Sequence, residues 1–318
     1  MKKILSIAIF TLLAVNYANA ARVEMMKDVP ERGDFDLGPT SFEIEASPGE
    51  KITKTMQITN RKGVAQNFLV AVEDFQGSMD DPEKTVLLQG DKDGKYGAKD
   101  WVVPEMTTFQ LKHGERQFFD VTIEVPKNAD AGDHYASVLV SAPPTVDAEN
   151  TEDRSKPNVM ITSRVGALFF VKVKGNIREE GMLRSFAVKE EINKQAPVDF
   201  KIIFENKGTV RIQPSGRIEI KNIAGNVVDV VAVNSFNVLR DSFRAVNFQW
   251  NPGDFSFGQY TAQLQLARGY GDLTDSKSVT FWVIPVKKIM IGIGIFAIMF
   301  LLIHFFRKNI KISTVKKK

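Results

Sequence analysis

The sequence predicts an all-β protein, with two tandem Ig-like β-sandwiches followed by one C-terminal transmembrane helix. Residues 21–286 contain short runs in which apolar and polar residues alternate, and each run is bounded by Gly, Pro, Asn or Asp. No helical periodicity is sustained in that segment. A single apolar stretch without charges follows at residues 289–306, long enough to cross a membrane as a helix.

The N-terminus has the pattern of a secretory signal peptide. Residues 1–20 begin with two lysines, continue with an apolar run, and end with Ala18 and Ala20 at the −3 and −1 positions. We expect cleavage after Ala20. The alternative is a short anchor helix, but an apolar run of about 12 residues is too short to span a bilayer.

The C-terminus predicts a single membrane crossing. A transmembrane helix at 287–306 precedes a basic cytosolic tail at 307–318. By the positive-inside rule the tail stays in the cytoplasm. The expected location is therefore the cell membrane, with the bulk of the chain outside the cytoplasm, at the cell surface or in the periplasm.

The charge distribution argues against a nucleic-acid partner. The chain of 318 residues has a formal net charge of +4, from 42 Lys and Arg against 38 Asp and Glu. Residues 1–20 carry two lysines and residues 287–318 carry eight basic residues, with no acid in either segment. The segment between them has a net charge of −6. A domain that binds a polyanion through bulk charge should be basic instead.

Alternating runs define two domains. After an N-terminal linker at 21–35, the first Ig-like domain covers 36–175 and the second covers 181–284. The polar stretch 143–158 is expected to be a loop inside the first domain, because a long strand follows it. The expected strands are 42–46, 51–59, 68–72, 107–111, 118–125, 135–140, 167–173, 198–204, 217–223, 227–233, 245–250, 260–266 and 278–284.

Two short echoes relate the domains. The Asn, Lys and Gly of residues 60–63 return at 206–208, each time after a strand, and the Gly and Tyr of 132–135 return at 258–260. Internal duplication is one explanation. The shared physics of one kind of fold is the other.

The sequence offers little catalytic chemistry. His113 and His134 lie in or beside expected turns, and His304 lies in the membrane segment, close enough to its basic end to reach the interface. The zinc, nucleophile-elbow and P-loop motifs are missing, and there is no cysteine. We therefore assign no catalytic, cofactor or metal residues. A hydrolase with a site assembled in space is the weakest of three functional hypotheses.

One segment has part of a calcium-loop pattern. Residues 91–95 read Asp-Lys-Asp-Gly-Lys, but Lys95 stands where a further oxygen ligand is needed. We expect a solvated loop there.

Residues 227–233 form a valine-rich run with one charge. At the edge of a sheet such a strand would invite addition of a partner strand. We expect the alternative, an interior strand.

Several motifs resemble a known family. Ser-Pro-Gly-Glu at 47–50 precedes a strand that ends in Ile-Thr-Asn at 58–60, and further matching motifs lie at 103–104, 109–115 and 121–135. Together they resemble the WxL-interacting proteins of bacterial cell surfaces, and more weakly the Ig-like folds of periplasmic pilus chaperones. The resemblance implies that the first domain binds peptidoglycan and that the second meets a protein partner. It implies no numbered binding residue.

We therefore expect a non-catalytic, membrane-anchored binding or adhesion protein outside the cytoplasm. Its Ig-like domains would hold peptidoglycan or a cell-surface protein, without nucleic acid or a small-molecule cofactor. The alternative is a chaperone-like assembly factor for exported surface or pilus subunits that acts by β-strand addition.

Overall fold

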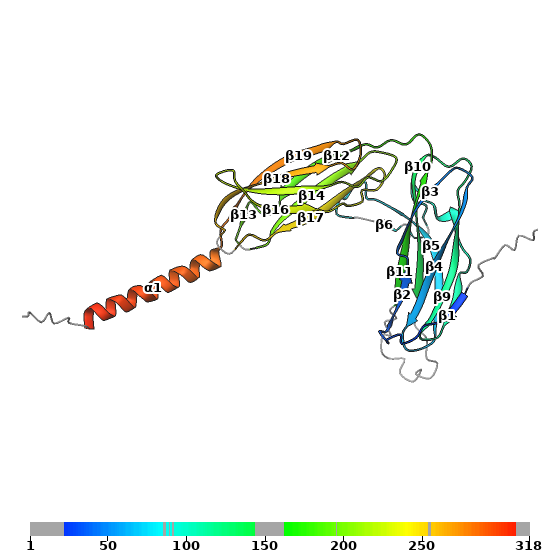
Figure 1. The fold of residues 1–318 in the computed structure, drawn as a ribbon, viewed down its shortest axis with the longest axis horizontal. Helices are drawn as coiled ribbons and strands as arrows, with labels where there is room; N and C mark the ends of the chain where they lie inside the picture. Colours follow the sequence, from blue (N-terminus) through cyan, green and yellow to red (C-terminus); the bar gives the residue numbers. More distant parts are fainter. Residues whose placement is uncertain are drawn as a thin grey trace, which may run out of the picture.

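The structure, a computed structural model, describes residues 22–84, 87–88, 90, 92–143, 162–194, 196–253 and 256–309. The expected signal peptide with Ala18 and Ala20, Asp91, most of the 143–158 loop and the end of the basic tail lie outside the described residues. The predicted fold class is confirmed. Two elongated β-sandwiches meet at an elbow, and a single long helix leaves the second one (Figure 1).

Domain 1, residues 22–173, packs two sheets face to face. Alternate residues point between the sheets, and Phe68, Phe119 and Phe169 fill the centre of the core with almost no exposed surface. The first sheet has the order β1 (Arg22–Met25), β9 (Glu115–Glu124), β4 (Lys51–Arg61), β2 (Asp34–Gly38), with β7 (Val102–Pro104) also on β9. The second has the order β3 (Ser41–Ala46), β11 (Ser163–Val173), β10 (Gly132–Ala142), β5 (Gln66–Gln76), β6 (Leu87–Leu88), with β8 (Thr108–Leu111) also on β5. A short 3₁₀ helix, η1 (Lys99–Trp101), precedes β7.

The segment 21–35 was expected to be a linker, and the structure corrects this. It contains β1 and the first residues of β2, which pair with β9 and β4. The run Arg22–Met25 is only four residues long, too short for its alternation to indicate a strand. Strand β1 forms because its backbone pairs with β9, and a local sequence pattern does not show such pairing.

Domain 2, residues 181–283, is a second two-sheet sandwich. One sheet has the order β12 (Gly181–Val188), β14 (Val198–Asn206), β17 (Ser242–Trp250). The other has the order β13 (Ile192–Asn193), β19 (Thr274–Val283), β18 (Gly258–Ala267), β15 (Ser215–Asn222), β16 (Val227–Val233). Phe200, Phe204 and Phe281 lie fully buried between the sheets. Residues 174–180 join this domain to the first.

The two sequence echoes adopt the same local structure. Asn60 at the end of β4 donates from Nδ2 to the carbonyl four residues on, at 2.8 Å, and to Leu111 O, at 2.8 Å. Asn206 at the end of β14 repeats this, at 2.9 Å, with Val238 O as the second acceptor, at 3.0 Å. In both cases Oδ1 accepts the N–H two residues on. Each asparagine thus closes the turn that follows a long strand, β4 in domain 1 and β14 in domain 2.

The C-terminal helix α1 (Val286–Asn309) begins three residues after β19 ends. Its Val286–Arg307 segment is long and apolar enough to cross a membrane, and it contains an 18-residue window with a mean hydropathy of 2.6. At about 1.5 Å per residue this segment is about 33 Å long, close to the thickness of a hydrocarbon core.

Candidate functional site

Strand β16 is an open edge of domain 2. It pairs with β15, and among the described residues no strand pairs along its other side. The expectation of an interior strand is therefore wrong. A run of valines has the composition of a buried strand, yet Val227, Val228 and Val230 are 50%, 48% and 50% exposed. Sequence composition could not reveal this, because the position of a strand within its sheet depends on long-range pairing.

The side chains of β16 divide between the core and the solvent. The register places Val231 opposite the buried Ile218, and Val231 packs against the core. Val230 therefore points to the outer face, because neighbouring residues alternate, and Val228 lies exposed at a register shift of the strand. The single charge, Asp229, is bound from inside the domain, where its Oδ2 accepts from Trp250 Nε1 at 2.8 Å. The edge thus carries no lysine or proline of the kind that usually protects an edge strand.

One edge of the opposite sheet in domain 2, strand β17, is covered by domain 1. Phe243 N in β17 donates to Ser78 O at 2.8 Å, and Ala245 N donates to Pro82 O at 2.7 Å. An ion pair between Lys201 and Glu83 joins the same two parts. The covering segment follows β5, so the chain shields β17 with its own backbone and leaves β16 open.

Domain 1 has a second, shorter open edge on β11. Strand β3 pairs with β11 only from Leu168 onward, and among the described residues nothing pairs with the free side of 163–167. Val165 lies opposite the buried Val140 and so faces the core, but it is 38% exposed. A strand added beside these residues would cover an apolar side chain that the fold itself leaves open.

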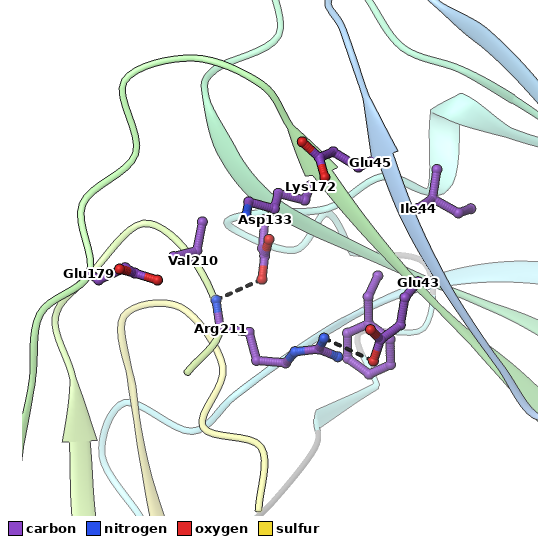
Figure 2. A pocket seen from close by; sticks show the side chains of 9 residues that line it. Glu43, Ile44, Glu45, Asp133, Lys172, Glu179, Val210 and Arg211 are labelled. Atoms are coloured by element: carbon purple, nitrogen blue, oxygen red, sulfur yellow. Dashed lines mark hydrogen bonds and ion pairs between the residues drawn. The ribbon is translucent and has the colours of Figure 1, made fainter. Parts of the chain in front are cut away.

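A polar cleft of about 340 Å³ lies between the domains. Figure 2 shows Arg211 of domain 2 reaching across it to residues of domain 1. Arg211 N donates to Asp133 Oδ2 at 2.6 Å, and Arg211 Nη2 lies 2.9 Å from Glu43 Oε1. The guanidinium also lies 4.5 Å from the centre of the Phe170 ring. The other lining residues are Ile44, Glu45, Lys172, Glu179 and Val210.

A second set of contacts completes the joint. The Arg240 guanidinium stacks over the Tyr96 ring at 3.7 Å, and its Nη1 donates to Asp133 O at 3.2 Å. Arg240 N also donates to the hydroxyl of the buried Tyr135 at 2.9 Å. Lys95 Nζ pairs with Asp241 at 2.6 Å. The cleft groups that make close contacts therefore bind the other domain, and we assign the cleft to domain assembly.

Asp133 provides a test of this joint. Burial raises the pKa of its carboxyl group, and the bond from Arg211 N and the charges of Arg211 and Lys172 only partly oppose this. The folded chain thus holds this proton to a higher pH than the unfolded chain does, so the contribution of Asp133 to stability falls as pH rises between the two pKa values. We expect Asp133→Asn to stabilise domain 1 near neutral pH, with a gain that shrinks below pH of about 4.

Urea unfolding of the full chain in detergent, once near neutral pH and once below pH of about 4, measures this effect. The exposed carboxylate Asp36, changed to Asn, is the control and should shift neither curve. A loss of stability in Asp133→Asn near neutral pH would contradict the prediction.

His113 and His134 are held by backbone groups in separate places. His113 Nδ1 accepts from Gly63 N at 3.1 Å, and its Nε2 lies 3.1 Å from Val29 O. His134 Nε2 lies 3.0 Å from Asp130 O, and burial lowers the pKa of this ring. His304 lies on α1. The structure brings none of these rings into a shared site with a nucleophile.

The calcium-loop candidate is only partly described, because Asp91 lies outside the described residues. Asp93 pairs with Lys99 Nζ at 2.7 Å, and Gly94 N donates to Asp74 Oδ2 at 2.9 Å. Within the described residues no group of three His, Asp or Glu could hold a metal ion.

No protein-family model matches the sequence, and a search of curated proteins finds no match. Similar solved structures include the class 5 fimbriae chaperone CfaA, at 14% identity and a TM-score of 0.37 over 79% of this chain and 100% of that one. The YadV chaperone has 7% identity and a TM-score of 0.38 over 77% and 100% of the two chains. The CsuC–CsuE chaperone–tip subunit complex of Acinetobacter baumannii has 14% identity and a TM-score of 0.37 over 79% of this chain and 99% of that one.

These structures contain chaperones, the class of protein in the weaker of the two sequence resemblances. The resemblance to WxL-interacting proteins gains no support. At such identities and scores the comparison describes a kind of fold and carries no conclusion about what this chain binds.

Proposed function

We propose that this protein is a membrane-anchored, non-catalytic assembly factor that holds an extended segment of an exported protein by β-strand addition. The open edge of β16 is the observation that carries the proposal. Strand addition needs unpaired backbone groups along an edge and pockets or apolar side chains beside it. Strand β16 has both over seven residues, with Val228 and Val230 exposed.

Two further features support strand addition. The fold covers the β17 edge with the backbone of residues 78–82 and leaves β16 uncovered, which separates a protected edge from an available one. The free part of β11 exposes Val165 from the core face and offers a second position for a strand. A client with two extended segments could use both edges.

Helix α1 supplies the anchor in this proposal, with domains 1 and 2 outside the cytoplasm. The signal-peptide pattern and the basic tail support this orientation. The anchor keeps the factor at the membrane that an exported client has just crossed. The expected binding of peptidoglycan has no supporting observation in this structure, so we do not retain it as the main function.

The β16 edge can be tested in the cell that makes the protein. A photo-crosslinking amino acid at Val228 of the full chain should join it to an extended segment of an exported protein, which mass spectrometry of the adduct identifies. Val230→Lys should remove most of the adduct, because a lysine on the edge disfavours strand pairing. Gln265→Lys, on the outer face of the central strand β18, is the matched control and should leave the adduct unchanged.

A second measurement checks the mode of binding. A synthetic peptide with the captured sequence should slow hydrogen exchange of the β16 amides in the purified full chain. Adducts that persist in Val230→Lys, or protection that falls outside both β16 and β11, would contradict strand addition.

A further inference from the structure

Exposed apolar side chains gather at the end of domain 2 from which α1 leaves. Ile192 in β13, Ile223 in the turn after β15, Phe257 before β18 and Trp282 near the end of β19 are 50%, 81%, 63% and 41% exposed. Single exposed apolar residues are ordinary on a protein surface, but a group at one end indicates contact with an apolar phase or partner.

The strand register places these residues at one level. Ile192 lies opposite Trp282. On its other side, Trp282 lies opposite Gln259. The residue after Gln259, Tyr260, lies opposite Asn222, where the turn that contains Ile223 begins. Phe257 precedes Gly258, whose partner is Val283, the last residue of β19. All four side chains therefore lie on the last turns and strand ends before the helix.

The same end carries lysines around an apolar hollow. A cavity of about 140 Å³ is lined by Lys194, Lys287 and Lys288 together with Ala196, Pro252, Gly253, Ser256, Val283 and Pro285. Lysine at the end of a membrane helix commonly reaches toward lipid phosphate groups. Glu190 and Glu191 lie on the neighbouring turn, so this end is not strongly basic and its apolar residues dominate the contact.

We propose that this end of domain 2 rests in the headgroup layer of the membrane that α1 crosses, with Phe257 and Ile223 inserted among the phospholipids. The proposal rests on the membrane anchoring by α1 in the proposed function, but not on capture of a client by β16. The partner is the phospholipid surface, because α1 continues directly from the same strand end.

The distance of Phe257 from the start of α1, measured along the membrane normal, agrees with this arrangement. Two residues, Ile284 and Pro285, separate β19 from α1. At about 3.3 Å per residue, the level of Phe257 is within roughly 10 Å of the first turn of the helix. The headgroup layer extends roughly 5 to 7 Å beyond the hydrocarbon core on each side. A large side chain such as that of Phe257 spans the remaining few ångström and so reaches the interface, where aromatic residues are enriched.

Such a contact would fix how domain 2 stands on the membrane. The β15–β16 turn would lie at the lipid surface, and β16 would run from there toward the elbow. A flexible tether would leave the orientation of that edge free, whereas a docked domain holds it at a constant angle.

The experiment uses the full chain in nanodiscs made of equal parts phosphatidylcholine and phosphatidylglycerol. The chain has no cysteine, so Phe257→Cys and Ile223→Cys each accept a single spin label. Electron paramagnetic resonance then compares collisions with oxygen, which concentrates in lipid, and with a water-soluble nickel chelate. Leu273→Cys is the matched control, because Leu273 is 47% exposed in the turn between β18 and β19 at the opposite end of domain 2.

We expect a severalfold higher ratio of oxygen to nickel collisions at 257 and 223 than at 273. Equal ratios at the three positions would overturn the proposal. In a second variant, Phe257→Asp combined with Ile223→Cys should return the label at position 223 to the ratio found at position 273. An unchanged ratio there would show that Phe257 does not hold this end on the membrane.

Discussion

Replacing Asn206 with alanine should lower the free energy of unfolding of domain 2 by about 3 kcal/mol. The side chain is almost fully buried and makes three hydrogen bonds, two of them to backbone carbonyls at 2.9 and 3.0 Å. Alanine would leave those carbonyls and the N–H of Gly208 without partners in the interior. An unpaired buried polar group costs roughly 1–3 kcal/mol, so the loss exceeds that of an ordinary surface substitution.

Urea unfolding of the full chain in detergent measures this loss, with the buried Trp250 of domain 2 as the fluorescent reporter. Asn247→Ala is the control, because Asn247 is exposed on the edge strand β17 of the same domain, and it should change stability by less than about 0.5 kcal/mol. Asn60→Ala should have the corresponding effect on domain 1. A loss in Asn206→Ala no larger than that of the control would show that the turn relaxes to satisfy its own backbone.

The alternation of apolar residues was enough to predict the interior strands of both domains. Phe119, Val121 and Ile123 all point to one face of β9 and are buried, as a period of two requires. The strands missed by this reasoning are short or lie at sheet edges, such as β1 and β13. Their residues belong to a strand because a neighbouring backbone pairs with them, and local composition does not record that pairing.

The position of β16 in its sheet is another feature that local composition does not show. Its valines predicted a strand correctly, but they predicted burial as well. Whether such a strand is interior depends on where the chain runs after Val233 and on how that later segment packs. Here the chain goes on to β17 in the other sheet, so β16 keeps a free side.

The contacts between the domains could not be predicted from local sequence patterns either. Arg211 and Arg240 belong to no motif and are far from Asp133 in sequence, yet the three residues meet across the elbow. The echo of Gly132 and Tyr135 was the nearest signal. Gly132 has a φ of +119°, and a Cβ there would lie 2.3 Å from Thr209 O. The sequence therefore marked the place where the domains approach each other but did not reveal the approach itself.

Leu239→Ala should loosen this elbow more than any single change to its polar contacts. Leu239 is 5% exposed, and its neighbours are three aromatic rings of domain 1, Phe75, Tyr135 and Phe170. Truncating a buried leucine removes roughly 2–5 kcal/mol of packing. Because these neighbours belong to the other domain, the loss falls on the contact between domains.

The angle between the domains is the direct readout. Spin labels on cysteines at the exposed positions Asn67 and Asn247 report the distance from domain 1 to domain 2 by double electron–electron resonance, since the chain has no native cysteine. We expect a narrow distribution in the parent chain and a broad one in Leu239→Ala, with Leu273→Ala as the exposed leucine control.

The outcome also bears on how the two open edges work together. Strand β11 belongs to domain 1 and β16 to domain 2, so a client that uses both requires them at a fixed separation. If the elbow opens in Leu239→Ala, the second segment of such a client loses the gain in effective concentration that a fixed geometry gives. Capture at Val228 should then weaken although β16 itself is unchanged. A broad distance distribution with undiminished capture would instead show that β16 binds its client alone.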